Sequence, residues 1–220
     1  MNNILKMALA ASVLASATMA SAVVYNSNET NVRVPATGTG GTTAASYSSM
    51  TFTVTGSGPI TSISFTMDWG TREDTVDSPG KEHTFAGDLD MLLVAPDGTR
   101  VVLMSDMGGG GDLNGVYTIA DGGGVWGATA NLAPGTYATA GSLVNEMMGP
   151  LGSTNQAAGT MATFNGINAN GTWTLHIQDD AGGDFGYMNS ASLNIEAVPE
   201  PATMTALALG AAAMLRRRRK

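Results

Sequence analysis

The chain has 220 residues, no cysteine and a formal net charge of −8, which excludes disulfides and cysteine nucleophiles. Six of its ten basic residues lie at the two ends, so the stretch from Val23 to Val198 has four basic residues against 17 carboxylates, a net charge of −13. A body this acidic repels phosphate, which argues against nucleic acid as a partner and favours divalent cations.

The first segment has the order of a secretory signal peptide. Lys6 supplies a short positive region, residues 7–17 are apolar, and Ala20 and Ala22 frame a small-residue cleavage site. We expect signal peptidase to cut after Ala22 and to leave residues 23–30 as a linker. The alternative is a buried N-terminal helix, which would be expected to have a polar face.

The residues that follow predict an all-β body of about seven to nine short strands separated by turn residues. Residues 50–54 and 60–69 alternate apolar and polar side chains, and the Gly-Ser-Gly-Pro between them predicts that they form a hairpin. Residues 89–94 and 100–104 are apolar on both faces, as central covered strands are. Pro96-Asp97-Gly98 between these two runs predicts a tight turn.

Two more alternating strands are predicted near the C-terminal end of the body. Their inward-facing residues are Trp173, Leu175, Ile177, Leu193 and Ile195. By contrast, residues 108–160 are rich in glycine and have little periodicity, so they predict a long loop region with one strand at 116–119.

Three aromatic residues lie in this glycine-rich region: Tyr117, Trp126 and Tyr137. They could form a platform on which sugars stack, or they could fix the loop onto the body, since large aromatic side chains are mostly buried. The sequence leaves both interpretations open.

Four motifs, taken in order, resemble the P domain, or Homo B domain, that follows the catalytic domain of subtilisin-like proprotein convertases. They are a His-Thr-aromatic lead at 83–85, Gly-Asp-Leu at 87–89, a Pro-x-Gly-Thr turn at 96–99 and Gly-Thr-Trp-Thr-Leu at 171–175. The resemblance spans residues 31–197. It implies a jelly-roll-like β-sandwich of the galactose-binding type.

The sequence departs from this family in two places. Residues 69–82 interrupt the passage to His83, where the family usually runs on directly, so we expect an inserted loop. Ala191 stands where the family commonly has tryptophan. Because Ala191 shares the inward face of Leu193 and Ile195, we expect different or thinner packing there.

No enzymatic activity is predicted. A subtilisin-like active site needs an Asp, a His and a Ser in one constellation. The only histidines, His83 and His176, lack a His-Gly-Thr setting, and the chain has no Gly-Thr-Ser-Met segment. We interpret both histidines as structural. Carboxylates are plentiful enough for a glycosidase, but no pair of them has a recognisable pattern.

Two acidic groups predict a calcium site. Asp88 and Asp90 lie at the start of a strand, while Asp179, Asp180 and Asp184 crowd the loop Asp-Asp-Ala-Gly-Gly-Asp. Calcium takes about six to eight hard oxygens, and glycines leave loop carbonyls free to turn inward. In the alternative interpretation Asp88 and Asp179 cap turns and the others face solvent. The resemblance adds that bacterial P domains often carry calcium.

The chain ends in Pro199-Glu200-Pro201, an apolar run at 202–215 and five consecutive cations. The prolines hold Glu200 in extended form. The run would be about 21 Å long as a helix, which is marginal against a membrane core of about 30 Å. The cations would keep the end of the chain in the cytoplasm.

This tail resembles the PEP-CTERM signal of exosortase-processed bacterial proteins, which are frequently linked to exopolysaccharide and biofilm matrix. We therefore expect residues 198–220 to form a short transmembrane sorting helix that inserts transiently and is removed by an exosortase-like enzyme. A permanent membrane anchor is the alternative.

These features together predict an exported, non-catalytic β-sandwich with a structural or adhesive role in the cell envelope or extracellular matrix. One alternative is a carbohydrate-binding module whose partner is extracellular polysaccharide. Another is an accessory P domain that serves a separate subtilisin-like serine protease.

Overall fold

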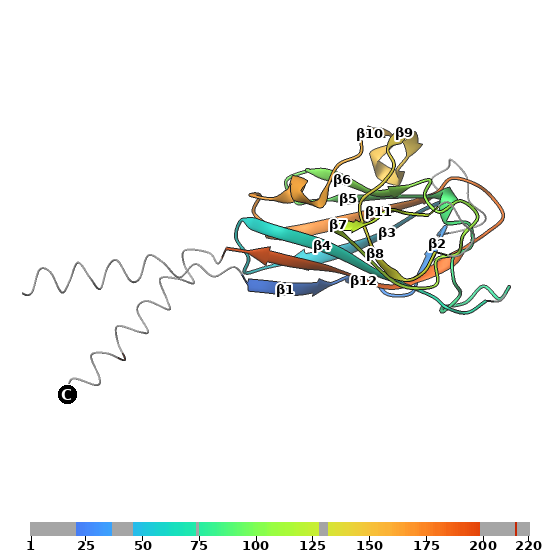
Figure 1. Cartoon of the computed structure of the whole chain (residues 1–220), viewed down its shortest axis with the longest axis horizontal. Helices are drawn as coiled ribbons and strands as arrows, with labels where there is room; N and C mark the ends of the chain where they lie inside the picture. The colour runs from blue at the N-terminus through green and yellow to red at the C-terminus, as the bar shows by residue number, and fades with distance from the viewer. Residues whose placement is uncertain (1–20, 37–45, 74, 128–131, 199–213, 215–220) are drawn as a thin grey trace, which may run out of the picture.

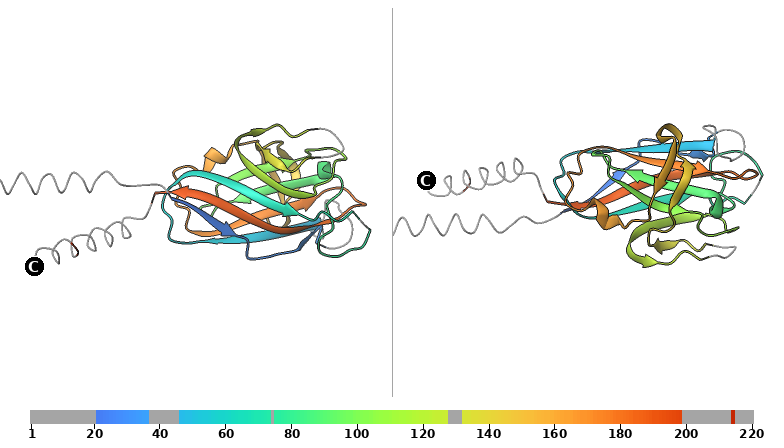
Figure 2. Two further views of the ribbon diagram at one scale, coloured as in Figure 1. Left: turned by 60° about the horizontal axis from the view of Figure 1, so that its bottom comes forward. Right: turned by 90° about the horizontal axis from the view of Figure 1, so that it is seen from above.

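A computed structural model describes residues 21–36, 46–73, 75–127, 132–198 and 214 of the chain. These residues form an all-β body with two larger open sheets and a small two-stranded sheet (Figures 1 and 2). Nearly all of the predicted sorting helix and of the predicted signal peptide lies outside the described residues. Within the described part, no helix has the length and apolar character needed to cross a membrane.

The first sheet has the strand order β1, β12, β4, β7, β8, and β2 also pairs with β12. Its strands are β1 (Ser21–Asn26), β2 (Val32–Val34), β4 (Ile60–Trp69), β7 (Gly115–Gly124), β8 (Gly135–Tyr137) and β12 (Gly186–Ala197). Residues 23–26 were predicted to belong to a linker, but they lie in β1 and pair with β12. A local sequence pattern could not reveal this pairing because the partner strand lies at the other end of the chain.

The second sheet has the antiparallel strand order β3, β11, β5, β6. Its strands are β3 (Tyr47–Val54), β11 (Gly171–Asp179), β5 (Leu89–Val94) and β6 (Arg100–Ser105). The tight turn predicted between β5 and β6 is confirmed. Gly98 has a φ of 88°, which favours glycine, and its N–H donates to the carbonyl of Ala95 at 2.9 Å.

The inner faces of these two sheets share one hydrophobic core. The inward-facing residues predicted for β11 and β12 all lie in it, as does Ala191. Phe52 of β3 and Phe65 of β4 meet edge to face, with 6.1 Å between ring centroids. The predicted hairpin of residues 50–54 and 60–69 is wrong, because these strands belong to different sheets. Alternation identifies the buried face of a strand but not its hydrogen-bonding partner.

The glycine-rich region contains more strands than its sequence predicts. The predicted strand at 116–119 lies within β7. The sequence did not predict the other three strands of this region, which are β8, β9 (Leu143–Met147) and β10 (Ser153–Gln156). The described residues therefore contain twelve strands instead of seven to nine. The described residues also include the short 3-10 helices η2 (Ala86–Asp88), η3 (Gly149–Leu151) and η4 (Met161–Phe164).

The β9–β10 hairpin, residues 143–156, covers the outer face of the second sheet. In Figure 1 it lies beyond β5 and β6, on the side away from β1 and β12. Leu92 of β5 is buried in a small cluster with Leu143 and Met148 of the hairpin region, and the Tyr47 ring leaves no room for a side chain at Gly149. This cover explains why β5 is apolar on both faces.

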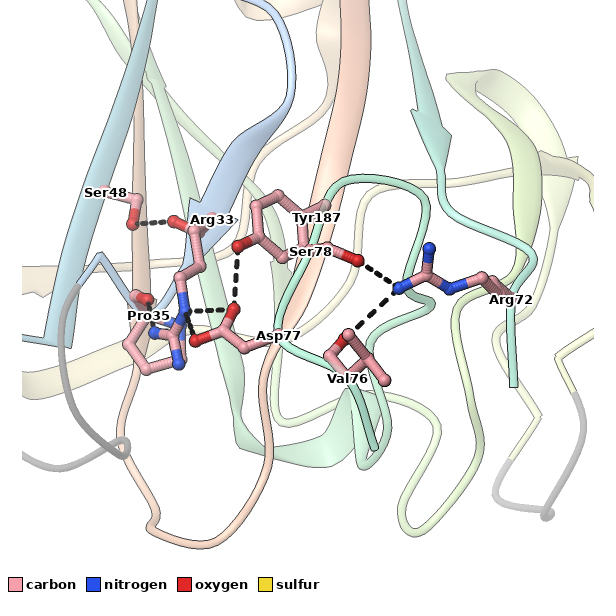
Figure 3. Close-up of polar contacts among 8 residues, drawn as sticks. All are labelled: Arg33, Pro35, Ser48, Arg72, Val76, Asp77, Ser78 and Tyr187. Atoms are coloured by element: carbon pink, nitrogen blue, oxygen red, sulfur yellow. Dashed lines mark hydrogen bonds and ion pairs between the residues drawn. The ribbon is translucent and has the colours of Figure 1, made fainter. Parts of the chain in front are cut away.

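The inserted loop expected at residues 69–82 begins after Trp69, the last residue of β4, and is fixed to the first sheet (Figure 3). The Asp77 carboxylate accepts hydrogen bonds from Arg33 Nε of β2 at 2.9 Å and from the Tyr187 hydroxyl of β12 at 2.7 Å. The Arg33 guanidinium lowers the pKa of this carboxyl. Within the loop, Arg72 donates to Ser78 and to the carbonyl of Val76.

His176 lies on the outer face of β11, opposite Leu92 of β5, and is only 5% exposed. Its Nδ1 is 3.0 Å from the Tyr47 hydroxyl. Burial, together with the charge of Arg100, lowers the pKa of His176 to about 4. These contacts support a structural role for this histidine.

We expect protonation of His176 to destabilise the fold. Because its folded-state pKa lies below the unfolded value, its contribution is complete above about pH 6.5 and is lost as the pH falls towards 4. A His176→Asn variant keeps a hydrogen-bond acceptor but cannot be protonated. When the pH is lowered from 7 to 4.5, the free energy of unfolding, measured with urea, should fall by about 2 kcal/mol less in the variant than in wild type.

Carboxylates titrate in both proteins over the same range, so the difference between the two profiles isolates the histidine. Parallel profiles for wild type and variant would contradict this expectation.

Candidate metal centre

The predicted acidic residues meet at the end of the body where β5 begins and β11 ends. Antiparallel pairing sets Asp90 of β5 opposite Gln178 and sets Leu89 opposite Asp179 of β11. The backbone N–H of Asp180 donates to the carbonyl of Asp88 at 2.9 Å. Two acidic groups that are distant in sequence are therefore brought together by sheet register.

Asp90 and Asp180 form a tight group with Glu146, a residue that the sequence analysis missed. Each side chain offers one carboxylate oxygen, and the three oxygens lie within 4.8 Å of one another. We call these residues the three-carboxylate cluster. Over the described ranges, it is the one group of three or more His, Asp or Glu side chains with such spacing.

Glu146 lies on β9, inside the region predicted to be mainly loop. One sequence signal could have identified it: Glu146 is the only Asp, Glu, Lys or Arg between Asp121 and Asp179. An isolated charge in such a long neutral stretch is unusual for a solvent-exposed loop. Its partner residues, however, could be found only from the fold.

A β-bulge lies next to Glu146. Glu146 is opposite Thr154, but the next pair is Val144 with Asn155, so Asn145 is the extra residue. Asn145 has a φ of 63°, and its side chain is hydrogen-bonded to Asn155 Nδ2 at 3.1 Å. Bulges redirect side chains, and this one accompanies the approach of Glu146 to Asp90 and Asp180.

Asp90 is a buried acid without a compensating donor. It is fully buried, and neither carboxylate oxygen accepts a hydrogen bond. Ser105, its cross-strand neighbour, donates instead to the carbonyl of Ser142 at 3.3 Å. Burial raises the pKa of Asp90 to about 7, although the nearby Ser105 hydroxyl acts in the opposite direction, and the charges of Asp106, Glu146 and Asp180 add to the rise.

The pKa values of the other two members of the cluster, Asp180 and Glu146, are also raised. Burial, followed by the charges of Asp106 and Glu146, raises the pKa of Asp180 to about 6. Burial and Asp106 also raise the pKa of Glu146. The ionised forms of all three acids are thus disfavoured by their surroundings, and a bound cation would offset this cost.

A second acidic group lies beside the first. His83 and Asp179 are fully buried, with His83 Nε2 3.3 Å from Asp179 Oδ2. The other oxygen of Asp179 and Oδ2 of Asp184 have no hydrogen-bond partner. Burial raises the pKa of Asp184 to about 6, with a further contribution from Asp179. A cavity of about 230 Å³ adjoins this group and is lined by Thr84, Phe85, Asp88, Gly182, Gly183 and Asp184.

His83 also packs against the core. Its ring meets Trp69 edge to face at 5.4 Å, and Gly186 lies so close to the backbone of Glu82 and His83 that a side chain there would collide with it. This burial supports the structural interpretation of His83.

The loop that carries Asp184 is supported by β2 and by the inserted loop. Arg33 and Lys81 place their charges over the Phe185 ring, at 4.7 and 4.8 Å from its centroid. The backbone N–H of Tyr187 donates to the carbonyl of Lys81 at 3.0 Å. Two of the four basic residues of the body therefore lie beside the loop that follows Asp179.

These groups fit a hard divalent cation. The donors are carboxylate oxygens with glycine-rich loops beside them, as calcium prefers, and the chain has no thiolate for a softer metal. Asp90, Glu146 and Asp180 would hold one ion. Asp88, Asp179 and Asp184 would hold another, although their oxygens are not grouped as closely.

The three aromatic residues of the glycine-rich region pack on one another. Trp126 and Tyr137 are stacked at 4.2 Å, and Tyr117 lies 6.4 Å from Trp126. Trp126 and Tyr117 are buried, and both donate hydrogen bonds to backbone carbonyls. They fix this region to the body, so they do not offer an open platform for sugars.

Comparison with known families gives two matches. The description "Proprotein convertase P-domain" matches residues 136–195, and "PEP-CTERM protein-sorting motif" matches residues 197–220. Both resemblances found in the sequence are thereby confirmed. The sorting motif indicates an exported protein that is directed to the cell envelope and processed by an exosortase-like enzyme.

Among solved structures, the chain is similar to a crystal structure of the Aeromonas sobria serine protease in complex with its chaperone. The identity is 15% and the TM-score 0.36, and the match covers 88% of this chain and 29% of that chain. No curated protein matches the sequence.

We expect Asp90→Asn to stabilise the protein when no metal is bound. The substitution removes a buried charge, so at pH 8 in EDTA the free energy of unfolding should rise by about 1–3 kcal/mol. In millimolar calcium the variant should gain less stability than wild type, because it lacks one ligand. Urea unfolding of both proteins under both conditions measures this.

The matched control is Asp97→Asn, in the exposed turn between β5 and β6, which should behave as wild type. In EDTA, wild type should also gain stability as the pH falls from 8 to 6. The folded-state pKa of Asp90 is raised to about 7, so the stability provided by protonation is lost as the pH rises through that value. A destabilised Asp90→Asn protein in EDTA would contradict the expectation.

Proposed function

We propose that this protein is an exported, non-catalytic module with a jelly-roll-like β-sandwich of the galactose-binding type. Its role would be structural or adhesive, in the cell envelope or extracellular matrix. The observation that carries this proposal is the position of the sorting motif relative to the body.

The two ends of the described body lie side by side. Ser21 at the start of β1 is opposite Ala197 at the end of β12 (Figure 1). The backbone N–H of Val198 still donates to the carbonyl of Pro59 at 3.0 Å, directly before Pro199. The sandwich therefore extends to Val198, inside the matched sorting motif at 197–220, and the predicted signal cleavage after Ala22 belongs to the same end of the body.

The acidic groups lie at the opposite end. β12 begins at Gly186, next to the loop of Asp184, and ends at Ala197, a span of about 36 Å. While the tail is inserted in the membrane, the acidic end would therefore point away from it. This orientation supports a role in contacts outside the cell.

We further propose that calcium stabilises the module through Asp88, Asp179 and Asp184 and through the three-carboxylate cluster. Extracellular modules bind calcium with dissociation constants of about 10⁻⁴ to 10⁻³ M. A tenfold excess over such a constant would add about 1.4 kcal/mol of stability. The buried, unpartnered oxygens of Asp90 and Asp179 support this proposal.

The polysaccharide-binding alternative is favoured by one observation. Phe85 is 53% exposed and lies at the cavity beside Asp88 and Asp184. An exposed aromatic ring next to carboxylates is a combination that sugar-binding sites use. The accessory P-domain alternative is favoured by the family match at 136–195.

Mass spectrometry of the native protein tests the processing on which the proposal depends. Protein isolated from the envelope and from the medium should begin at Val23 and should lack residues 202–215, because a transient sorting helix is removed. A variant in which Glu200 is replaced by Gln should retain the tail if the carboxylate is recognised. Recovery of intact tail peptides on the mature wild-type chain would instead identify a permanent anchor.

A further inference from the structure

The β9–β10 hairpin is attached to the body by few polar contacts. Its two strands pair only with each other, so no ladder of backbone hydrogen bonds joins them to the sheet beneath. The apolar contacts are the Tyr47 ring against Gly149 and a small cluster in which Leu92 and Val102 of the sheet meet Leu143 and Met148, with Val94 and Leu151 at its edge. A cover held by so small a cluster would be expected to open locally.

Without a bound cation, the ionised carboxylate of the hairpin and those of the body repel one another. Glu146 is the only charged residue in 143–156, and it faces Asp90 and Asp180 within 4.8 Å. Carboxylates at this distance oppose docking when they are ionised.

The basic residues of the body lie elsewhere. Arg33, Arg72 and Lys81 make their contacts around the inserted loop. Arg100 begins β6 opposite Val94, whereas Ser105, at the other end of β6, is opposite Asp90. No basic side chain of the described body is therefore positioned to neutralise the cluster.

The burial of Asp90 is the independent sign that a ligand belongs here. Its side chain is fully buried, both oxygens lack a hydrogen-bond donor, and its carboxylate is directed to Glu146 and Asp180. Buried ionised groups are retained when they are paired or when they coordinate a metal. The bulge at Asn145 provides the geometry in which Glu146 completes this set.

We infer that a calcium ion bound by Asp90, Glu146 and Asp180 is a latch that holds the β9–β10 hairpin over the outer face of the second sheet. With calcium, the hairpin covers Leu92 and Val102. Without calcium, repulsion among the three carboxylates loosens the hairpin and admits water to this apolar surface. The inference rests on the calcium binding proposed above and adds a specific ligand, Glu146, and a specific consequence.

Hydrogen–deuterium exchange of the purified protein tests the latch. At pH 8, calcium at 5 mM should slow amide exchange in peptides covering 143–156 by about tenfold relative to EDTA, which corresponds to about 1.4 kcal/mol of local stabilisation. Peptides from the core strand at 172–178 should change less. Glu146→Gln should abolish the effect on the hairpin, and Asp180→Asn should do the same.

The matched control is Glu196→Gln, an exposed glutamate of β12 at the opposite end of the body, which should retain the full calcium effect. Near-ultraviolet circular dichroism establishes that each variant is folded. Calorimetric titration with calcium distinguishes a failure of the latch from a failure of the calcium binding on which it rests. Calcium binding without any change in hairpin exchange would overturn the latch alone, whereas no binding would overturn both. Full calcium protection in a folded Glu146→Gln protein would also overturn the latch.

Discussion

The pairing of β12 on both of its edges is the interaction on which the rest of the structure depends. Along one edge it pairs with β2 and then β1, and along the other with β4. Its inner face contributes Leu193 and Ile195 to the core. Its first residue follows the acidic loop and its last residue is the first of the matched sorting motif, so this one strand sets the separation between the acidic end and the end that leads into the motif.

The charges of the body are segregated as a consequence of the fold. The inserted loop collects Arg33, Arg72 and Lys81 into contacts with Asp77, Phe185 and its own backbone. Among the described residues, Asp90 and Asp180 have no basic partner, whereas Asp179 lies 3.3 Å from His83. In an exported protein without disulfides, a cation at this position would connect the loop after β11, the start of β5 and the β9–β10 hairpin.

The glycine-rich region shows how a sequence with weak periodicity can still be ordered. Tyr117, Trp126 and Tyr137 stack together, and Gly123 and Gly141 allow backbone approaches that any larger residue would prevent. Glycine here permits close contact between chain segments, and the stacked rings and backbone hydrogen bonds supply the stability.

The sequence by itself determined the all-β class, the inward faces of β11 and β12, the turn between β5 and β6, the two family resemblances and the acidic groups from which a cation site could be built. These depend on local order: alternation, turn residues and short motifs. The tertiary structure alone decided that residues 50–54 and 60–69 lie in opposite sheets, that residues 23–26 form an edge strand, and that Glu146 joins Asp90 and Asp180. Each of these depends on pairing between distant segments, and local periodicity carries no information about which strand will be the partner.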